Sequence, residues 1–207
     1  MYRPAAHAVD EVAVAIAMLR DHGFGHLVVV GRDGLDSVPL PVLIDDAGER
    51  VRAHVARANP IWRDMPTAGL LVVSPDDAYV SPSWYPSKET EPRVVPTWNY
   101  EVVHVKGIVR ARQDPEWLSV LVRDLTDHHE SALPAPWSVD DAPSDHIERM
   151  LRGIVGIELA VESIEAKRKL SQNRSADDVS GVVSGLSARD DRSRAVAAAM
   201  RRTPTSR

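Results

Sequence analysis

The chain has 207 residues, 43% of them hydrophobic and 27% charged, which is the composition of a globular protein with one large domain. It has no cysteine, which excludes disulfides and thiolate metal sites, and we expect no metal. The formal net charge of −5 lacks the basic excess typical of strong nucleic-acid binders. No apolar run approaches the roughly 18 residues of a membrane span, and we expect a cytoplasmic location.

The first part of the chain predicts a helix followed by hairpin-linked strands. Residues 10–22 read as a helix, with Asp10 as the N-cap and Gly23 as the stop. The β-branched run 26–30, the turn at Arg32-Asp33-Gly34 and the extended run 38–44 predict a hairpin. Further strands are expected at 50–55, 69–73 and 78–80, with a short helical segment at 59–64.

The second part alternates a long loop, two long strands and several helices. Prolines punctuate residues 81–97, which predicts a loop, and loops of this length in compact domains are often functional. Strands are expected at 99–112 and 154–164, and helices at 115–129, 143–152 and 175–186. Residues 188–207 are charged or alanine-rich, and we expect a short helix there followed by disorder.

About six strands with helices at the start, middle and end indicate a mainly β fold, a small antiparallel barrel with peripheral helices. A β-sandwich is the alternative. We expect residues 1–187 to form this domain with its C-terminal helix, and residues 188–207 to form a tail.

Four polar and aromatic clusters carry the chemistry. Arg57 can bind a phosphate through paired donors, and the N–H groups of the helical turn that follows favour an anion. The serines and rings of residues 81–88 suit a planar heteroaromatic ligand. Each cluster also has a structural reading: a surface arginine beside a hydrogen-bonded histidine, aromatic rings that pack a loop, a strand histidine in the core, or a solvated charge run. The candidate residues are His54, Arg57 and Asn59; Ser81, Ser83, Trp84, Tyr85 and Lys88; Thr97, Trp98, Asn99 and Tyr100; and Lys169, Ser171, Gln172 and Asn173.

These segments, in this order, resemble the PaiB-type family of FMN-binding negative transcriptional regulators. The resemblance rests on the stretches 54–62 (HVARANPIW), 79–88 (YVSPSWYPSK), 95–100 (VPTWNY) and 169–174 (KLSQNR), and it covers roughly residues 1–187. It implies a six-stranded split β-barrel related to pyridoxamine-phosphate oxidases, with FMN held at a homodimer interface. Pro39 stands where the family has a histidine, and Arg168 where it has a tryptophan.

The resemblance also implies roles for the clusters. Arg57 and Asn59 are expected near the FMN phosphate, residues 81–88 and 98–100 along the ring and ribityl chain, and residues 169–174 in the pocket of the facing subunit. We expect a regulator that responds to ligand or redox state through a protein partner, without reading bases itself. The alternatives are an FMN-dependent oxidoreductase, with His104 and Tyr85 as proton-handling candidates, and a haem-binding relative on the same scaffold.

Overall fold

The computed structural model describes residues 1–203, which form two compact units. Unit 1 comprises Met1–Ala15, Ser74–Val103 and the chain from Glu165 onward, and unit 2 comprises Ile16–Val73 and His104–Ile164. One helix and two long strands contribute residues to both units. Among the described residues, no helix combines the length and apolar character needed to cross a membrane.

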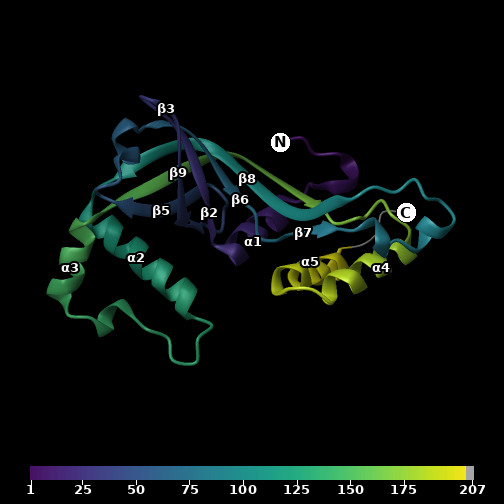
Figure 1. The fold of residues 1–207 in the computed structure, drawn as a ribbon. Helices are drawn as coiled ribbons and strands as arrows, with labels where there is room; N and C mark the ends of the chain where they lie inside the picture. The colour runs from purple at the N-terminus through teal and green to yellow at the C-terminus, as the bar shows by residue number, and fades with distance from the viewer. Residues whose placement is uncertain (204–207) are drawn as a thin grey trace. The chain divides into compact units, whose positions relative to one another are not determined.

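Nine strands and five α-helices make up the described chain (Figure 1). The strands are β1 (Ala8–Val9), β2 (Phe24–Gly31), β3 (Gly34–Pro41), β4 (Leu43–Ile44), β5 (Arg50–Ala56), β6 (Thr67–Val73), β7 (Asp77–Val80), β8 (Thr97–Arg112) and β9 (Ile154–Lys169). The helices are α1 (Val12–His22), α2 (Pro115–Glu130), α3 (Ser144–Arg152), α4 (Ala176–Ser187) and α5 (Asp191–Arg202). Six strands of seven residues or more therefore carry the sheet, as the sequence predicts.

In unit 2 the sheet curls into a barrel. Its strand order is β3-β2-β6-β8-β9-β5-β4, and the two end strands β3 and β4 are separated along the chain only by Val42. The two end strands of the sheet are thus consecutive in the chain, which brings the two edges of the curled sheet near each other. Alternate apolar side chains, including Leu27, Leu71 and Ile157, are at most 3% exposed and line a common interior. The predicted barrel is confirmed.

Two helices cover part of unit 2. Asp114 caps α2 by accepting a hydrogen bond from the Trp117 N–H at 2.7 Å. The apolar face of α2 is buried, and the ring of Trp117 occupies the space that a Cβ at Gly156 of β9 would need. An ion pair of 2.8 Å between Arg52 of β5 and Asp124 also holds α2 on the barrel. In contrast, α3 buries none of its residues.

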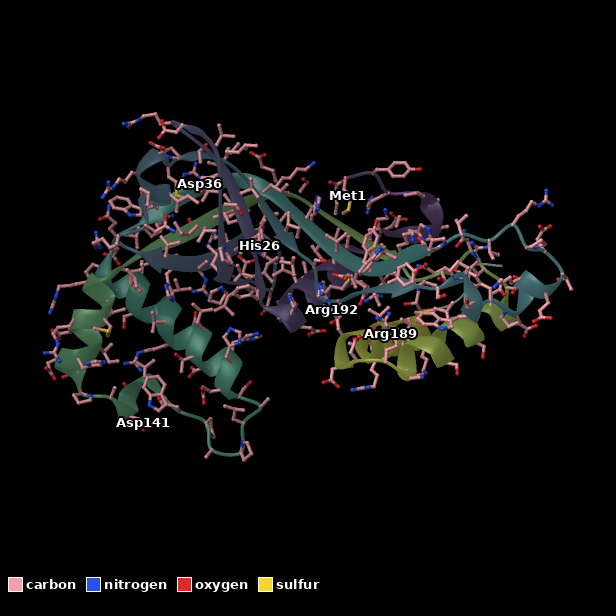
Figure 2. The ribbon with its side chains drawn as sticks, in the orientation of Figure 1. Met1, His26, Asp36, Asp141, Arg189 and Arg192 are labelled. Atoms are coloured by element: carbon pink, nitrogen blue, oxygen red, sulfur yellow. The ribbon has the colours of Figure 1, made fainter. Side chains whose placement is uncertain are left out.

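Unit 1 has its own core under β7. Helices α4 and α5 lie side by side there (Figure 1), and Val182, Leu186, Val196 and Met200 are at most 3% exposed. The 3₁₀ helix Pro82–Trp84 packs on α4 at two glycines; a Cβ at Gly181 would lie 2.1 Å from the Trp84 carbonyl oxygen. Arg192 of α5, which is labelled in Figure 2, forms an ion pair with Asp77 of β7.

Most element predictions agree with the structure in type and order, but the single strand predicted at 38–44 is divided at Val42 between β3 and β4, and β1 was not predicted. β9 continues to Lys169, five residues beyond the predicted strand, because it pairs there with β1 at Ala8↔Lys167 and Val9↔Ala166. The helix predicted within residues 188–207 is α5, whose small residues Ala197 and Ala199 are buried in the core of unit 1. The domain boundary after residue 187 stays a prediction, and the predicted disorder of residues 204–207 lies outside the described residues.

Pro39 lies on β3, paired with His26 of β2. It is exposed, and β3 ends the strand order. A proline has no N–H to donate, and an end strand is where that loss is tolerated. The Pro39 departure is therefore compatible with the barrel.

Candidate functional site

Unit 1 contains an open pocket of about 160 Å³ where the loop before β8 meets the end of β9. Six of the predicted residues line it, together with four that were not predicted. The lining residues are Tyr85, Thr97, Asn99, Lys169, Ser171 and Asn173, with His7, Val95, Pro96 and Arg174. We call it the basic pocket.

The basic pocket holds an uncompensated group of cations. Lys169 Nζ donates to Thr97 Oγ1 at 2.5 Å and to the Trp98 carbonyl, both neutral acceptors. Burial lowers the pKa of Lys169, and repulsion from Lys167 and Arg174 lowers this pKa further. Within residues 1–203 neither Lys169 nor Arg174 forms an ion pair with a carboxylate. A bound anion would relieve this repulsion.

A buried polar pair fixes the floor of the pocket. Asn99 is fully buried, and its Nδ2 donates to Ser171 Oγ at 3.0 Å and to Met200 Sδ at 3.4 Å. Ser171 adopts φ +65°, a left-handed conformation that is uncommon for a residue with a side chain. The contact with Asn99 accompanies this conformation, which turns the chain sharply after β9 and directs the following residues to the pocket.

Tyr85 supplies a buried hydroxyl that donates to no acceptor among the described residues. The side chain is 3% exposed, and the Arg174 guanidinium carbon lies 4.8 Å from the ring centroid. Burial raises the pKa of Tyr85, the nearby Arg174 partly offsets this rise, and the negative charge of Asp178 adds to it. The hydroxyl therefore stays protonated near neutral pH and is a free donor beside the cations.

Gln172 and Arg168 form hydrogen bonds and an ion pair within the protein, beside the pocket. Gln172 accepts from the Leu170 N–H at 2.7 Å and donates to the Arg168 carbonyl at 2.6 Å, which closes the turn after β9. Arg168 pairs through Nε with Glu101 at 2.6 Å. The arginine that replaces the family's tryptophan is thus held by a carboxylate and is not among the lining residues.

Aromatic rings and lysines gather on the outward face of β8. Trp98 is 52% exposed and meets Tyr79 of β7 edge to face at 6.2 Å. Lys167 Nζ lies 5.7 Å from the Tyr2 ring centroid and 5.2 Å from that of Tyr100. These rings offer flat apolar faces beside positive charge, which suits a planar, electron-poor ligand or a second protein surface.

The predicted loop 81–88 divides into structural and exposed residues. Ser81 caps the 3₁₀ helix by accepting from the Ser83 N–H at 3.2 Å, and Trp84 packs on α4. Ser87 donates to the buried carboxylate of Asp178 at 2.8 Å. Ser83 and Lys88 are exposed. Among the predicted residues of this loop, Tyr85 alone lines the basic pocket.

The cluster of His54, Arg57 and Asn59 belongs to unit 2. Arg57 donates to the carbonyls of Arg152 (2.8 Å) and Ile154 (3.0 Å) and to Gln113 Oε1 (2.8 Å). Asn59 caps the next 3₁₀ helix, accepting from the Ile61 N–H at 3.0 Å. Burial lowers the pKa of His54, which keeps its imidazole neutral near pH 7. These contacts are structural, and the expected phosphate contact of Arg57 and Asn59 stays a prediction.

Two polar lining residues were not among the individually named candidates. Arg174 ends the 169–174 stretch that the resemblance places in the pocket, although it was not named as a candidate itself. His7, whose Nδ1 lies 3.1 Å from Gln172 Oε1, comes from the opposite end of the chain. No local pattern marks it.

Comparison with known proteins agrees with this picture. The family model described as "Putative FMN-binding domain" matches residues 1–163. The chain is 31% identical to "Protease synthase and sporulation protein PAI 2" of Bacillus subtilis, with 90% of this chain and 89% of the relative covered. It is 29% identical to an uncharacterised protein of Aspergillus fumigatus, with 90% of each chain covered.

Solved structures with this fold have low sequence identity to the chain. A conserved hypothetical protein of Mycobacterium tuberculosis matches with a TM-score of 0.59 at 13% identity, over 84% of this chain and 94% of that one. The FAD- and haem-binding protein of Mycobacterium smegmatis matches with a TM-score of 0.56 at 13% identity, over 83% and 78%. The fold is the split barrel of flavin-binding proteins, and the chain belongs to the "Putative FMN-binding domain" family, in which it is similar to the PaiB-type protein of Bacillus.

Proposed function

We propose that the basic pocket holds the phosphate end of FMN. The observation that carries this proposal is the group of Lys169 and Arg174, two cations without a carboxylate partner in the described chain, beside the free donor of Tyr85. A phosphate needs such cations and donors. The residues fit one end of the cofactor, since a volume of about 160 Å³ is smaller than the roughly 300–1,000 Å³ of a complete small-molecule site.

The remainder of the site is proposed to come from a second copy of the chain. The exposed rings of Tyr2 and Trp98 and the exposed Val95 lie on unit 1 itself, at 83%, 52% and 65% exposure. Apolar surface of this kind, next to an incomplete pocket, favours a homodimer in which the isoalloxazine ring is covered by the partner. When bound, FMN supplies redox chemistry that the side chains lack.

The absorption spectrum of the purified protein tests cofactor binding. We expect flavin bands, either as purified or after FMN is added and the excess removed, at one FMN per chain. A spectrum without flavin bands after this treatment would contradict the proposal.

We propose a regulatory role in which flavin occupancy or redox state changes contacts with a protein partner. The resemblance of the chain to the PaiB-type family of regulators supports this role, and the net charge of −5 favours a protein partner over direct base reading. A gel shift at physiological salt is the test. We expect weak binding without sequence preference in oxidised and reduced states. Tight, sequence-selective binding would overturn the indirect mechanism.

A second candidate, an FMN-dependent oxidoreductase, is favoured by the buried, protonated hydroxyl of Tyr85 in the pocket. A donor of this kind can hydrogen-bond a substrate or move a proton to it. Anaerobic titration of the flavin-loaded protein with NADH and NADPH separates the candidates. Bleaching of the flavin band would support an oxidoreductase, and an unchanged band would count against a nicotinamide-dependent one.

A further inference from the structure

Unit 2 contains an open cavity of about 430 Å³ next to α2 and α3. Its volume falls within the roughly 300–1,000 Å³ of small-molecule sites. Its polar side chains are those of Arg57, Gln113, Glu148 and Arg152, and its apolar ones include Leu118 and Leu151. We call it the α2–α3 cavity.

The α2–α3 cavity offers unused hydrogen-bond donors. A guanidinium has five N–H groups, and the three contacts of Arg57 leave two of them free. Gln113 uses its carbonyl oxygen to accept from Arg57, so its amide N–H groups remain available. The Arg152 side chain forms no hydrogen bond or ion pair within residues 1–203, and only its backbone carbonyl is used.

The opposite side of the cavity is apolar and incompletely covered. Leu118 of α2 is already buried at 2% exposure, whereas α3 has no buried residue and its Leu151 is half-buried. An apolar body lying against Leu151 would cover the exposed part of this surface, which stabilises by roughly 25 cal/mol for each Å² removed from water.

The charges around the cavity favour an anion. Two arginines line it against one carboxylate, that of Glu148, which also has no partner in the described chain. We propose that the α2–α3 cavity binds a small organic anion with an apolar body, of the class of medium-chain carboxylates. The carboxylate group lies against Arg57 and Arg152, and Glu148 opposes the negative charge and weakens the binding of multiply charged anions.

Calorimetric titration of the full-length protein with octanoate is the test. We expect wild-type binding that Arg152→Gln weakens about tenfold, since a hydrogen bond to a charged group contributes about that factor. Glu148→Gln is expected to strengthen binding two- to fivefold because it removes a like charge. Arg149→Gln is the matched control: Arg149 lies on the same helix, pairs with Asp145 and does not line the cavity. It should leave the affinity unchanged.

Three results would overturn the proposal. The first is binding of octylammonium in place of octanoate, with Glu148→Gln abolishing it. The second is an equal loss of affinity in Arg149→Gln and Arg152→Gln, which would show only general electrostatic attraction. The third is displacement of octanoate by stoichiometric FMN, which would assign the cavity to the flavin, as the predicted phosphate contact of Arg57 implies.

Discussion

At the level of single residues, the site contains a cation without a counter-charge and a hydroxyl donor without an acceptor in the described chain. Lys169 is a cation among cations, and Tyr85 is a donor without an acceptor. Both conditions raise the free energy of the ligand-free protein locally, and both are relieved by a bound anion with hydrogen-bond acceptors.

The lowered pKa of Lys169 predicts how FMN affinity depends on pH. Because this pKa lies below the ordinary lysine value, Lys169 loses its proton at a lower pH than a free lysine does, whereas a bound phosphate favours the protonated form. FMN affinity should therefore fall as pH rises towards the ordinary lysine pKa of about 10.4, and the fall should begin at a lower pH than it would for an exposed lysine. Fluorescence titrations over this range measure it, and Lys169→Arg should flatten the dependence. Equal slopes for the wild type and this variant would exclude Lys169 as the titrating group.

The substitution Tyr85→Phe should lower FMN affinity without lowering the stability of the ligand-free protein. An unpaired buried hydroxyl contributes nothing favourable to folding, so urea unfolding of the ligand-free variant should show a free energy equal to the wild type or up to about 1 kcal/mol higher. FMN affinity should fall about three- to tenfold through the lost hydrogen bond. A variant that is clearly less stable without FMN would mean that the hydroxyl has a partner in the free protein.

At the scale of elements, sequence patterns predicted the barrel strands well. The turn at Arg32-Asp33-Gly34 produces the β2–β3 hairpin, and Gly34 there has φ +110°, a conformation that favours glycine. The burial of α5 was not predictable from its composition. Three of its five buried residues, Ser193, Ala197 and Ala199, are small, and small residues give little apolar periodicity although they pack closely.

The sequence indicated which kinds of residue make up the candidate site, but it did not indicate which of these residues contact one another. The pocket joins residues from the loop before β8, the end of β9 and the N-terminal segment, and only the family resemblance indicated the first two. Nothing local shows that Arg57 donates to the carbonyls of Arg152 and Ile154, because those contacts depend on long-range pairing of β5 with β9.

The close contact between α4 and the 3₁₀ helix at Trp84 predicts how a substitution at Gly181 changes stability. Alanine favours a helix over glycine by about 1 kcal/mol, yet at Gly181 its Cβ would lie 2.1 Å from the Trp84 carbonyl oxygen, a backbone atom. Gly181→Ala should therefore lower the free energy of unfolding by about 1–3 kcal/mol. Urea denaturation measures this, with Ser184→Ala on the exposed side of α4 as the control. Stabilisation by Gly181→Ala would show that the contact is looser than described.

For the whole molecule, we expect the association of two copies of the chain to be linked to FMN binding. If FMN is covered by a second copy, ligand that binds only the assembled form stabilises the dimer. Sedimentation velocity should show a dimer whose dissociation is suppressed by FMN. A monomer that binds FMN at full stoichiometry would contradict the shared site.

An FMN fluorescence titration of the wild type beside the Lys169→Ala/Arg174→Ala variant tests whether these two cations bind the FMN phosphate. We predict saturable quenching at one FMN per chain for the wild type, and at least about a hundredfold loss of affinity when both cations are removed, about tenfold for each. Unchanged affinity in the double variant, or a loss produced by Arg57→Gln alone in a protein that remains folded, would place the phosphate elsewhere and contradict the account.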